Sequence, residues 1–239
     1  MRIKKFNCKP TLKKKITIPT RKDLLPILNE LKPQIVNRVF TVEEIIELLG
    51  VFIGRRFNVD VTHATAHEVN PGDIDLNAYY DSGLDEAGDT SIELYLVTNH
   101  LDETMILNEK EFDSVAKRIM DSISHEMIHM KQHRARDFLE LDDKLAFVYA
   151  DNDQLESQLY LGTPDEIHAY AFNIAEELAE CPDLKKRLET PSKVGIDESL
   201  NLWAYLHTFE KDVEHPVMKR LLKKIYKNLA QMHGKKLVK

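Results

Sequence analysis

The chain has 239 residues, 43% of them apolar, and a formal net charge of −7. This composition is typical of a globular protein, and the length allows one large domain or two small ones. Neither of the two cysteines, Cys8 and Cys181, belongs to a CxxC pair, so we expect no disulfide framework and a reducing, cytoplasmic location. No apolar run reaches membrane-spanning length and no secretory leader is visible, so we expect no membrane partner.

Basic residues are concentrated in the first 22 positions, which hold no acidic residue. They are Arg2, Lys4, Lys5, Lys9, Lys13, Lys14, Lys15, Arg21 and Lys22. Such an arm could bind a nucleic acid or an acidic partner. The alternative is a solvated terminus, or a strand (Lys15–Ile18) whose lysine-rich face blocks edge pairing. We therefore treat residues 1–22 as a basic N-terminal arm and residues 23–239 as a single domain.

The first half of that domain combines two helices with three strands. Apolar spacing predicts helices over 20–31 and 41–53, the second started by a capping box at Thr41 and ended by Gly54. Alternating apolar residues predict strands over 57–62, 74–80 and 91–97. The acidic loop 81–89 lacks the spacing of a calcium-binding loop, so we expect a solvated turn there.

A long amphipathic helix follows, from a capping box at Asn108 to about Arg136, and it contains the sequence His125-Glu126-Met127-Ile128-His129. Histidines four positions apart lie about 40° apart around a helix and about 6 Å apart along it, so both can bind one ion. This HExxH pattern favours Zn²⁺ held by His125 and His129, with Glu126 placed to act on a metal-bound water. The alternative is that both histidines are ordinary core or surface residues.

The remainder of the chain reads as helical. We expect helical pieces in 145–160 after the acidic stretch Glu140–Asp143. Thr163 and Pro164 then predict the start of a helix that runs to about Cys181, and two more helices are predicted over 197–209 and 215–232.

A catalytic zinc site needs a third protein ligand. His133 continues the helical series but lies about 12 Å along the axis from His125, too far to share its ion, so we expect an exposed residue. The extended HExxHxxGxxH pattern is not met, because Gln132 and Ala135 stand at its glycine and third histidine. Glu166 is the better candidate, since it lies on a separate helix that packing can bring to the metal.

The two motifs, His125-Glu126-x-x-His129 and Glu166-x-x-Ala169, together resemble those of zincin metallopeptidases of the gluzincin type. The resemblance covers residues 57–180 and implies an α+β fold, with a small mixed or antiparallel sheet before the active-site helix and a mainly helical C-terminal half. It also implies an edge strand that pairs with the substrate, and 91–97 has that place in chain order. Some gluzincins carry an aspartate four residues after the glutamate ligand, where this chain has Tyr170, so Asp165 or His168 could support the ligands instead.

The resemblance therefore implies a zinc-dependent peptidase acting on a protein or peptide substrate, with Glu126 as general base and His125, His129 and Glu166 as metal ligands. Four residues are candidates for stabilising the oxyanion: Tyr149, Tyr160, Tyr170 and His207. Two other interpretations stay open. The fold could serve a structural or interaction protein with little or no turnover, or the basic arm could recruit the protein to nucleic acid.

Overall fold

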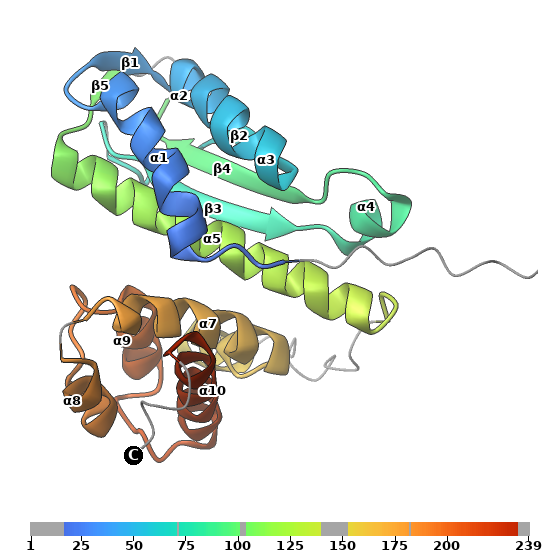
Figure 1. Ribbon diagram of the computed structural model, residues 1–239, viewed down its shortest axis with the longest axis vertical. Helices are drawn as coiled ribbons and strands as arrows, with labels where there is room; N and C mark the ends of the chain where they lie inside the picture. The colour runs from blue at the N-terminus through green and yellow to red at the C-terminus, as the bar shows by residue number, and fades with distance from the viewer. Residues whose placement is uncertain (1–16, 71, 101–103, 140–152, 182, 234–239) are drawn as a thin grey trace, which may run out of the picture.

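The computed structural model describes residues 17–70, 72–100, 104–139, 153–181 and 183–233 (Figure 1). The expected α+β class is confirmed, because small sheets precede the long helix α5 and the chain after it is helical. The N-terminal lobe, defined here as residues 17–139, comprises α1 (Arg21–Ile35), β1 (Val39–Thr41), α2 (Val42–Leu49), η1 (Gly50–Gly54), α3 (Arg55–Phe57), β2 (Val59–Thr65), β3 (Asp75–Tyr80), α4 (Ser82–Ala87), β4 (Ile92–Thr98), β5 (Thr104–Ile106) and α5 (Glu109–Ala135).

The C-terminal lobe, residues 153–233, is made of helices packed on one another. It comprises α6 (Asp153–Leu161), α7 (Pro164–Ala179), α8 (Leu184–Glu189), the short η2 (Pro191–Lys193), α9 (Leu200–Thr208) and α10 (Pro216–His233). The last two confirm the helices expected over 197–209 and 215–232. Helix α8 was not expected from the sequence.

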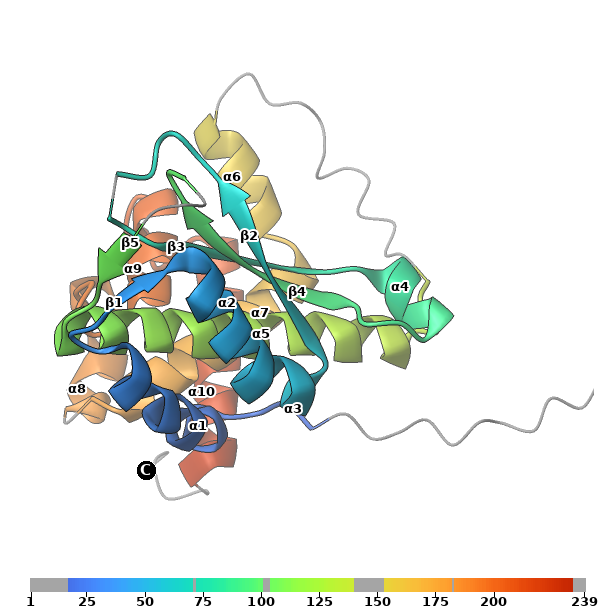
Figure 2. The ribbon, with the colours of Figure 1, turned by 90° about the horizontal axis from the view of Figure 1, so that it is seen from above.

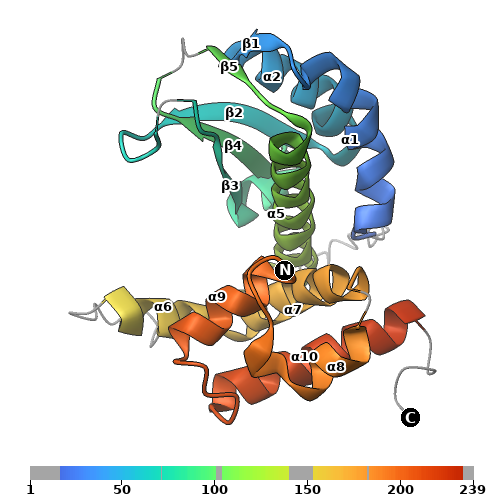
Figure 3. The same cartoon turned by 90° about the vertical axis from the view of Figure 1, so that its left-hand side faces the viewer.

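The main sheet has three strands in the order β2-β4-β3 and is mixed. Strand β2 runs parallel to β4, while β3 runs antiparallel to β4 and pairs Tyr80 with Ile92. The expectation that 91–97 forms the edge strand is wrong. This strand is β4, which is central in the sheet and carries the most buried apolar side chains. Strand β3 forms the edge that lies nearest the C-terminal lobe (Figure 3). A separate antiparallel pair, β1 with β5, was not expected.

Two other local expectations need correction. The second helix does not end at Gly54, since η1 and α3 carry it on to Phe57, and Asn58, with φ of 56°, ends it in the left-handed conformation. The acidic loop after β3 is not a plain solvated turn, because it holds α4, capped by Asp81. Asp85 of α4 is buried and accepts hydrogen bonds from Arg134 and the Tyr80 hydroxyl, which attaches α4 to the end of α5 (Figure 2).

Each lobe has its own hydrophobic core. In the N-terminal lobe, α1, α2 and one face of α5 pack with the sheet around a cluster that includes Leu28, Leu94 and Ile123. In the C-terminal lobe, α7, α9 and α10 enclose a second cluster that includes Ile174 and Leu221. Figure 3 looks along α5 and shows it between the two lobes, with α7 crossing beneath it.

Several expectations fall outside the described residues: the basic arm up to position 16, the acidic stretch 140–143, Tyr149 and Cys8. Of the strand expected over 15–18, Thr17 and Ile18 are described and are not in a strand. Arg21 and Lys22 belong to α1. Among the helices that are described, none is long and apolar enough to cross a membrane.

Candidate metal centre

Helix α5 presents the HExxH residues on its side facing the C-terminal lobe. A full capping box starts the helix: the Asn108 side chain accepts from the Glu111 amide, and the Glu111 carboxylate accepts from the Asn108 amide. Buried Ile119 and Ile123 hold the opposite side of α5 on the N-terminal core. The helix is therefore fixed by its cap and its apolar face, which leaves His125 and His129 directed at α7.

Helix α7 presents Glu166 in its first turn. Thr163 caps the helix by accepting a hydrogen bond from the Glu166 amide, and Pro164 occupies the first helical position, where a missing N–H is harmless. Ala169, one turn after Glu166, is completely buried where α7 packs on α5. Its small side chain allows the two helices to approach closely.

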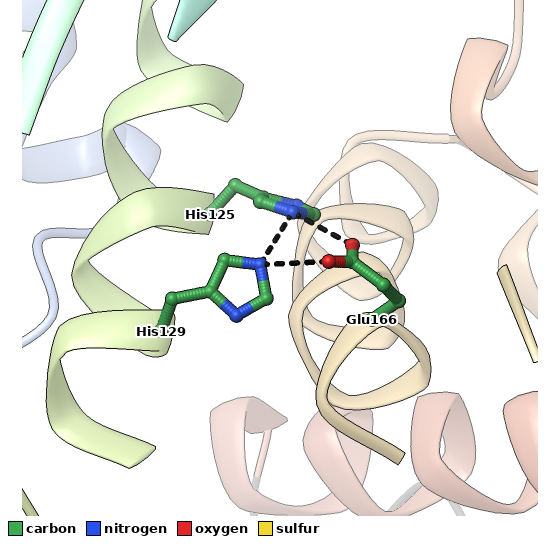
Figure 4. A group of neighbouring side chains, drawn as sticks. All are labelled: His125, His129 and Glu166. Carbon is green, nitrogen blue, oxygen red and sulfur yellow. Dashed lines mark hydrogen bonds and ion pairs between the residues drawn. The ribbon is translucent and has the colours of Figure 1, made fainter. Parts of the chain in front are cut away.

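The three predicted ligands come together (Figure 4). The Nε2 atoms of His125 and His129 lie 3.0 Å apart, and they lie 3.1 and 3.2 Å from the two carboxylate oxygens of Glu166. Metal bonds of about 2.0–2.1 Å at tetrahedral angles separate ligand atoms by about 3.3 Å. The side chains therefore already have a spacing that suits a tetrahedral ion, and among the described residues this is the one such group of histidine, cysteine or acidic side chains.

Hydrogen bonding alone explains this arrangement poorly. Each imidazole Nε2 carries at most one proton, yet here each faces both a carboxylate oxygen and the other ring nitrogen. If both nitrogens were protonated, each N–H could donate to Glu166, but the two nitrogens would then lie 3.0 Å apart with neither accepting from the other. If one were not, its lone pair would face a carboxylate oxygen with no proton between them. A cation at the centre would satisfy all three groups, so the donor set fits a metal such as Zn²⁺.

The electrostatics of the three ligands follow from their burial and mutual contact. Burial alone would raise the pKa of Glu166, but the two histidines outweigh it and lower that pKa to about 2. Burial would lower the pKa of His129, and contact with Glu166 raises it instead. Glu166 is thus a carboxylate at neutral pH, which is the form that binds a metal.

Glu126 lies beside this group without being part of it. Its side chain is 9% exposed, and burial raises its pKa despite the nearby histidines and a hydrogen bond donated by the Tyr80 backbone N–H of β3. The end of the edge strand thus reaches the predicted general base.

The residues that support the ligands differ from those suggested by the sequence. The side-chain oxygen of Gln132 lies 3.0 Å from Nδ1 of His129, where it can only accept a hydrogen bond. The side-chain amide nitrogen of Gln132 donates to the backbone carbonyl of Asp165. Asp165 takes part through that carbonyl and through an ion pair with Arg136, at 2.7 Å. His168 is exposed and faces lysines of α5 and α10, so it does not support the ligands.

Tyr170, which stands at the position of the family's aspartate, packs its ring edge-on against His125 with centroids 4.5 Å apart. Tyr205 packs in turn against Tyr170 and donates a hydrogen bond to the Leu161 carbonyl. His125 is therefore held by an aromatic stack in place of a carboxylate. His133, expected to be exposed, is half-buried and packs edge-on against Tyr80.

Of the oxyanion candidates, Tyr160 lies at the site. Its hydroxyl contacts the Glu166 carboxylate, and burial together with the Glu166 charge raises its pKa, so it stays a neutral hydroxyl. Tyr160 is nevertheless 45% exposed, so a substrate can reach it. His207 is exposed and stacks on Trp203. Tyr170, whose pKa burial raises to about 12, is occupied with His125.

A cleft of about 1000 Å³ lies near this centre but does not include its ligands. It is lined by the first turns of α5, the end of α7 and the start of α9, with Arg21 and Asp121 among its residues. The walls of this cleft are largely charged side chains and contain no HExxH residue, so the cleft is distinct from the candidate metal centre.

Sequence reasoning missed Gln132 and Arg21. Gln132 lies three residues after His129, a spacing that places two side chains together on a helix and was available as a signal. Arg21 had no such signal.

A comparison with protein-family models, curated proteins and solved structures found no match to this chain.

Proposed function

We propose that this chain is a zinc-dependent peptidase of the zincin type, with His125, His129 and Glu166 as metal ligands and Glu126 as general base. The observation that carries the proposal is the buried group of two imidazoles and a carboxylate at metal-ligand spacing, with a second buried carboxylate beside it. A bound zinc ion supplies a water of lowered pKa and polarises the scissile carbonyl.

Glu126 accepts the proton of that water and passes it to the leaving amine. Its raised pKa favours this role, because a carboxylate whose pKa lies above its ordinary value takes up a proton more readily. The Tyr80 backbone N–H holds the carboxylate in place. Tyr160 supports the oxyanion with its neutral hydroxyl.

The edge strand β3 offers a place for an extended peptide. Backbone groups of Leu76 and Tyr80 point away from β4, since the Leu76 carbonyl accepts from Arg118 and the Tyr80 N–H donates to Glu126. Ala78 lies midway between them and has the same orientation in an antiparallel strand. Its N–H and C=O are therefore the groups that would pair with a substrate backbone, next to the general base.

The main alternative is a protein with this fold that binds zinc for structure. A structural zinc site is closed by four protein ligands and needs no general base. Three predicted ligands and the placement of Glu126 favour chemistry over that alternative.

The test is to measure zinc content and peptide hydrolysis in the wild type, Glu166→Ala and Glu126→Gln. We expect about one zinc per chain in the wild type and in Glu126→Gln, and strong zinc loss in Glu166→Ala. Hydrolysis of a mixed peptide library should fall by at least about 10²-fold in Glu126→Gln, since it loses the base but keeps the metal. Wild-type protein that takes up no zinc after reconstitution would contradict the proposal, and zinc without hydrolysis would favour the structural alternative.

A further inference from the structure

The first residue of α1 carries a guanidinium group that is buried between the lobes. Arg21 is 5% exposed. It binds Asp121 of α5 in a bidentate manner, with Nη2 at 2.8 and 2.9 Å from the two carboxylate oxygens. Its Nη1 donates to Glu180, the C-cap residue of α7, at 3.0 Å, and Nη2 lies 3.7 Å from Glu177 of α7. One side chain therefore touches both helices that carry the predicted metal ligands.

The last turn of α7 and its C-cap contribute three acidic residues. Besides Glu177 and Glu180, Glu176 accepts a hydrogen bond from the Arg21 backbone N–H at 3.0 Å. Glu177 is fixed further by donors from Asn201 and Ser199, which caps α9. The Arg21 guanidinium is thus shared by three carboxylates, those of Asp121, Glu177 and Glu180, while Glu176 binds the backbone N–H of the same residue.

The position of Arg21 does not help to stabilise helix α1 itself. A cation at the first position of a helix opposes the helix dipole, so Arg21 is unfavourable there by itself. The carboxylates are equally unfavourable without it, because burial raises the pKa of Glu176 and of Glu177 to about 7 and raises that of Asp121. The buried guanidinium and the buried carboxylates therefore stabilise each other at the point where α1, α5 and α7 meet.

This cluster lies on the same helix pair as the metal centre. Asp121 is one turn before His125 on α5, and Glu177 is eleven residues after Glu166 on α7. Between them, Asn173 of α7 donates to the backbone carbonyl of Asp121 at 3.0 Å. On the far side of the metal centre, Gln132 bonds the Asp165 carbonyl. The ligands therefore lie between two sets of polar contacts that fix α7 against α5.

We propose that Arg21 is a positioning residue that holds α7 against α5, so that Glu166 meets His125 and His129 in metal-binding geometry. This inference rests on the proposed metal site, whose ligands it does not touch. It assigns a role to a residue that the sequence groups with the basic arm and that lies a hundred residues before its α5 partner.

The test compares zinc affinity in Arg21→Met, Arg21→Lys and the matched control Lys32→Met. Lys32 also lies on α1 and forms an ion pair with α5, at 2.9 Å to Asp113, but that pair lies within the N-terminal lobe. The dissociation constant is measured by competition with a chromophoric chelator, and the visible spectrum of Co²⁺ bound in place of zinc reports the ligand geometry. Circular dichroism and the thermal midpoint of the zinc-free proteins record folding separately.

We expect Arg21→Met to bind zinc about 10- to 100-fold more weakly than the wild type, the range found for residues that support metal ligands, and to change the Co²⁺ spectrum. Arg21→Lys keeps a cation but loses the bidentate bond, so its affinity should lie between the two. Lys32→Met should bind zinc like the wild type.

The inference is overturned if folded Arg21→Met binds zinc as tightly as Lys32→Met with an unaltered Co²⁺ spectrum. Should Arg21→Met not fold, Arg21→Lys decides: affinity equal to that of Lys32→Met overturns the inference, and weaker affinity supports it. If the wild-type protein binds no zinc, the proposed function is overturned and the inference with it. If the wild type binds zinc tightly and the Arg21 variants bind it with the same affinity, the inference alone is overturned.

Discussion

The two lobes differ in how they are built and in what they bring to the metal centre. The N-terminal lobe encloses its core between a mixed sheet and helices, and it supplies His125, Glu126 and His129. The C-terminal lobe is helical in its described part and supplies Glu166. Each buries its own apolar cluster, so the hydrophobic effect of these clusters stabilises each lobe internally.

Polar contacts fix the position of the two lobes relative to each other. On α7, Ile174 and Leu178 face the C-terminal core, whereas Asn173 and Glu177 face α5 and α1. On α5, Ile123 faces the N-terminal core, whereas His125 faces α7. Hydrogen bonds and ion pairs are directional, so they fix the register of the two helices more strictly than apolar packing does. The candidate metal centre lies at the boundary that these contacts fix.

The largest expected effect comes from removing the metal that would join the lobes. Because zinc binds the folded chain through ligands from both lobes, it should raise the free energy of unfolding. At a free zinc concentration about 1,000 times the dissociation constant, the gain is about 4 kcal/mol. Urea unfolding of the wild type with zinc and with a chelator measures it. Glu166→Ala is the control and should unfold at the same urea concentration with zinc and with the chelator. If the wild type binds zinc but also unfolds at the same urea concentration in both, zinc binding does not stabilise the folded chain.

A smaller effect concerns the boundary between the lobes and its dependence on pH. Burial raises the pKa of Glu177 to about 7 in the folded chain, above its ordinary value of 4.5. Between those values the folded chain holds a proton that the unfolded chain has released, so stability is full below pH 4.5 and falls as pH rises through 7. Glu177→Gln removes this loss, which amounts to about 1 to 3 kcal/mol.

Urea unfolding at several values between pH 5 and 7.5 measures the slope. The control is Glu47→Gln, a change at an exposed carboxylate of the N-terminal lobe, which should keep the wild-type pH dependence. If Glu177→Gln and the wild type lose stability in parallel as the pH rises, Glu177 is not the group that holds the proton in the folded chain.

Local patterns predicted the elements of both lobes better than the boundary between them. The spacing of His125 and His129 and the cap at Thr163 are set within a few residues, and the structure has the helices that these patterns indicated. The order of the strands was mispredicted, because pairing of β4 between β2 and β3 depends on contacts distant in sequence. Asp85 was assigned to a solvated turn because its partner Arg134 is 49 residues away.

The contacts that align the metal ligands were the least predictable. Arg21 was grouped with a basic arm by composition, and its partner Asp121 lies a hundred residues away in sequence. Gln132 was noted in the sequence only because it stands where the extended HExxHxxGxxH pattern has a glycine. Its contact with Nδ1 of His129 was not predicted. The role of Arg21 depends on tertiary geometry, for which a single sequence contains no local signal, whereas for Gln132 the three-residue spacing from His129 was such a signal.

The smallest expected effect compares the same change in each lobe. Thr41 and Thr163 both cap a helix by accepting from the amide three residues on, at 3.3 and 3.4 Å. Replacing either by alanine should lower the free energy of unfolding by about 1 kcal/mol. The amide capped by Thr163 is that of Glu166, so Thr163→Ala should also loosen the first turn of α7 and weaken zinc binding several-fold, whereas Thr41→Ala should leave it unchanged. Chemical unfolding and chelator competition measure the two quantities separately, with Thr163→Ser as the variant that keeps the hydroxyl. Equal zinc affinities for all three variants would mean that Glu166 is held by its contacts with α5 and not by the start of its own helix.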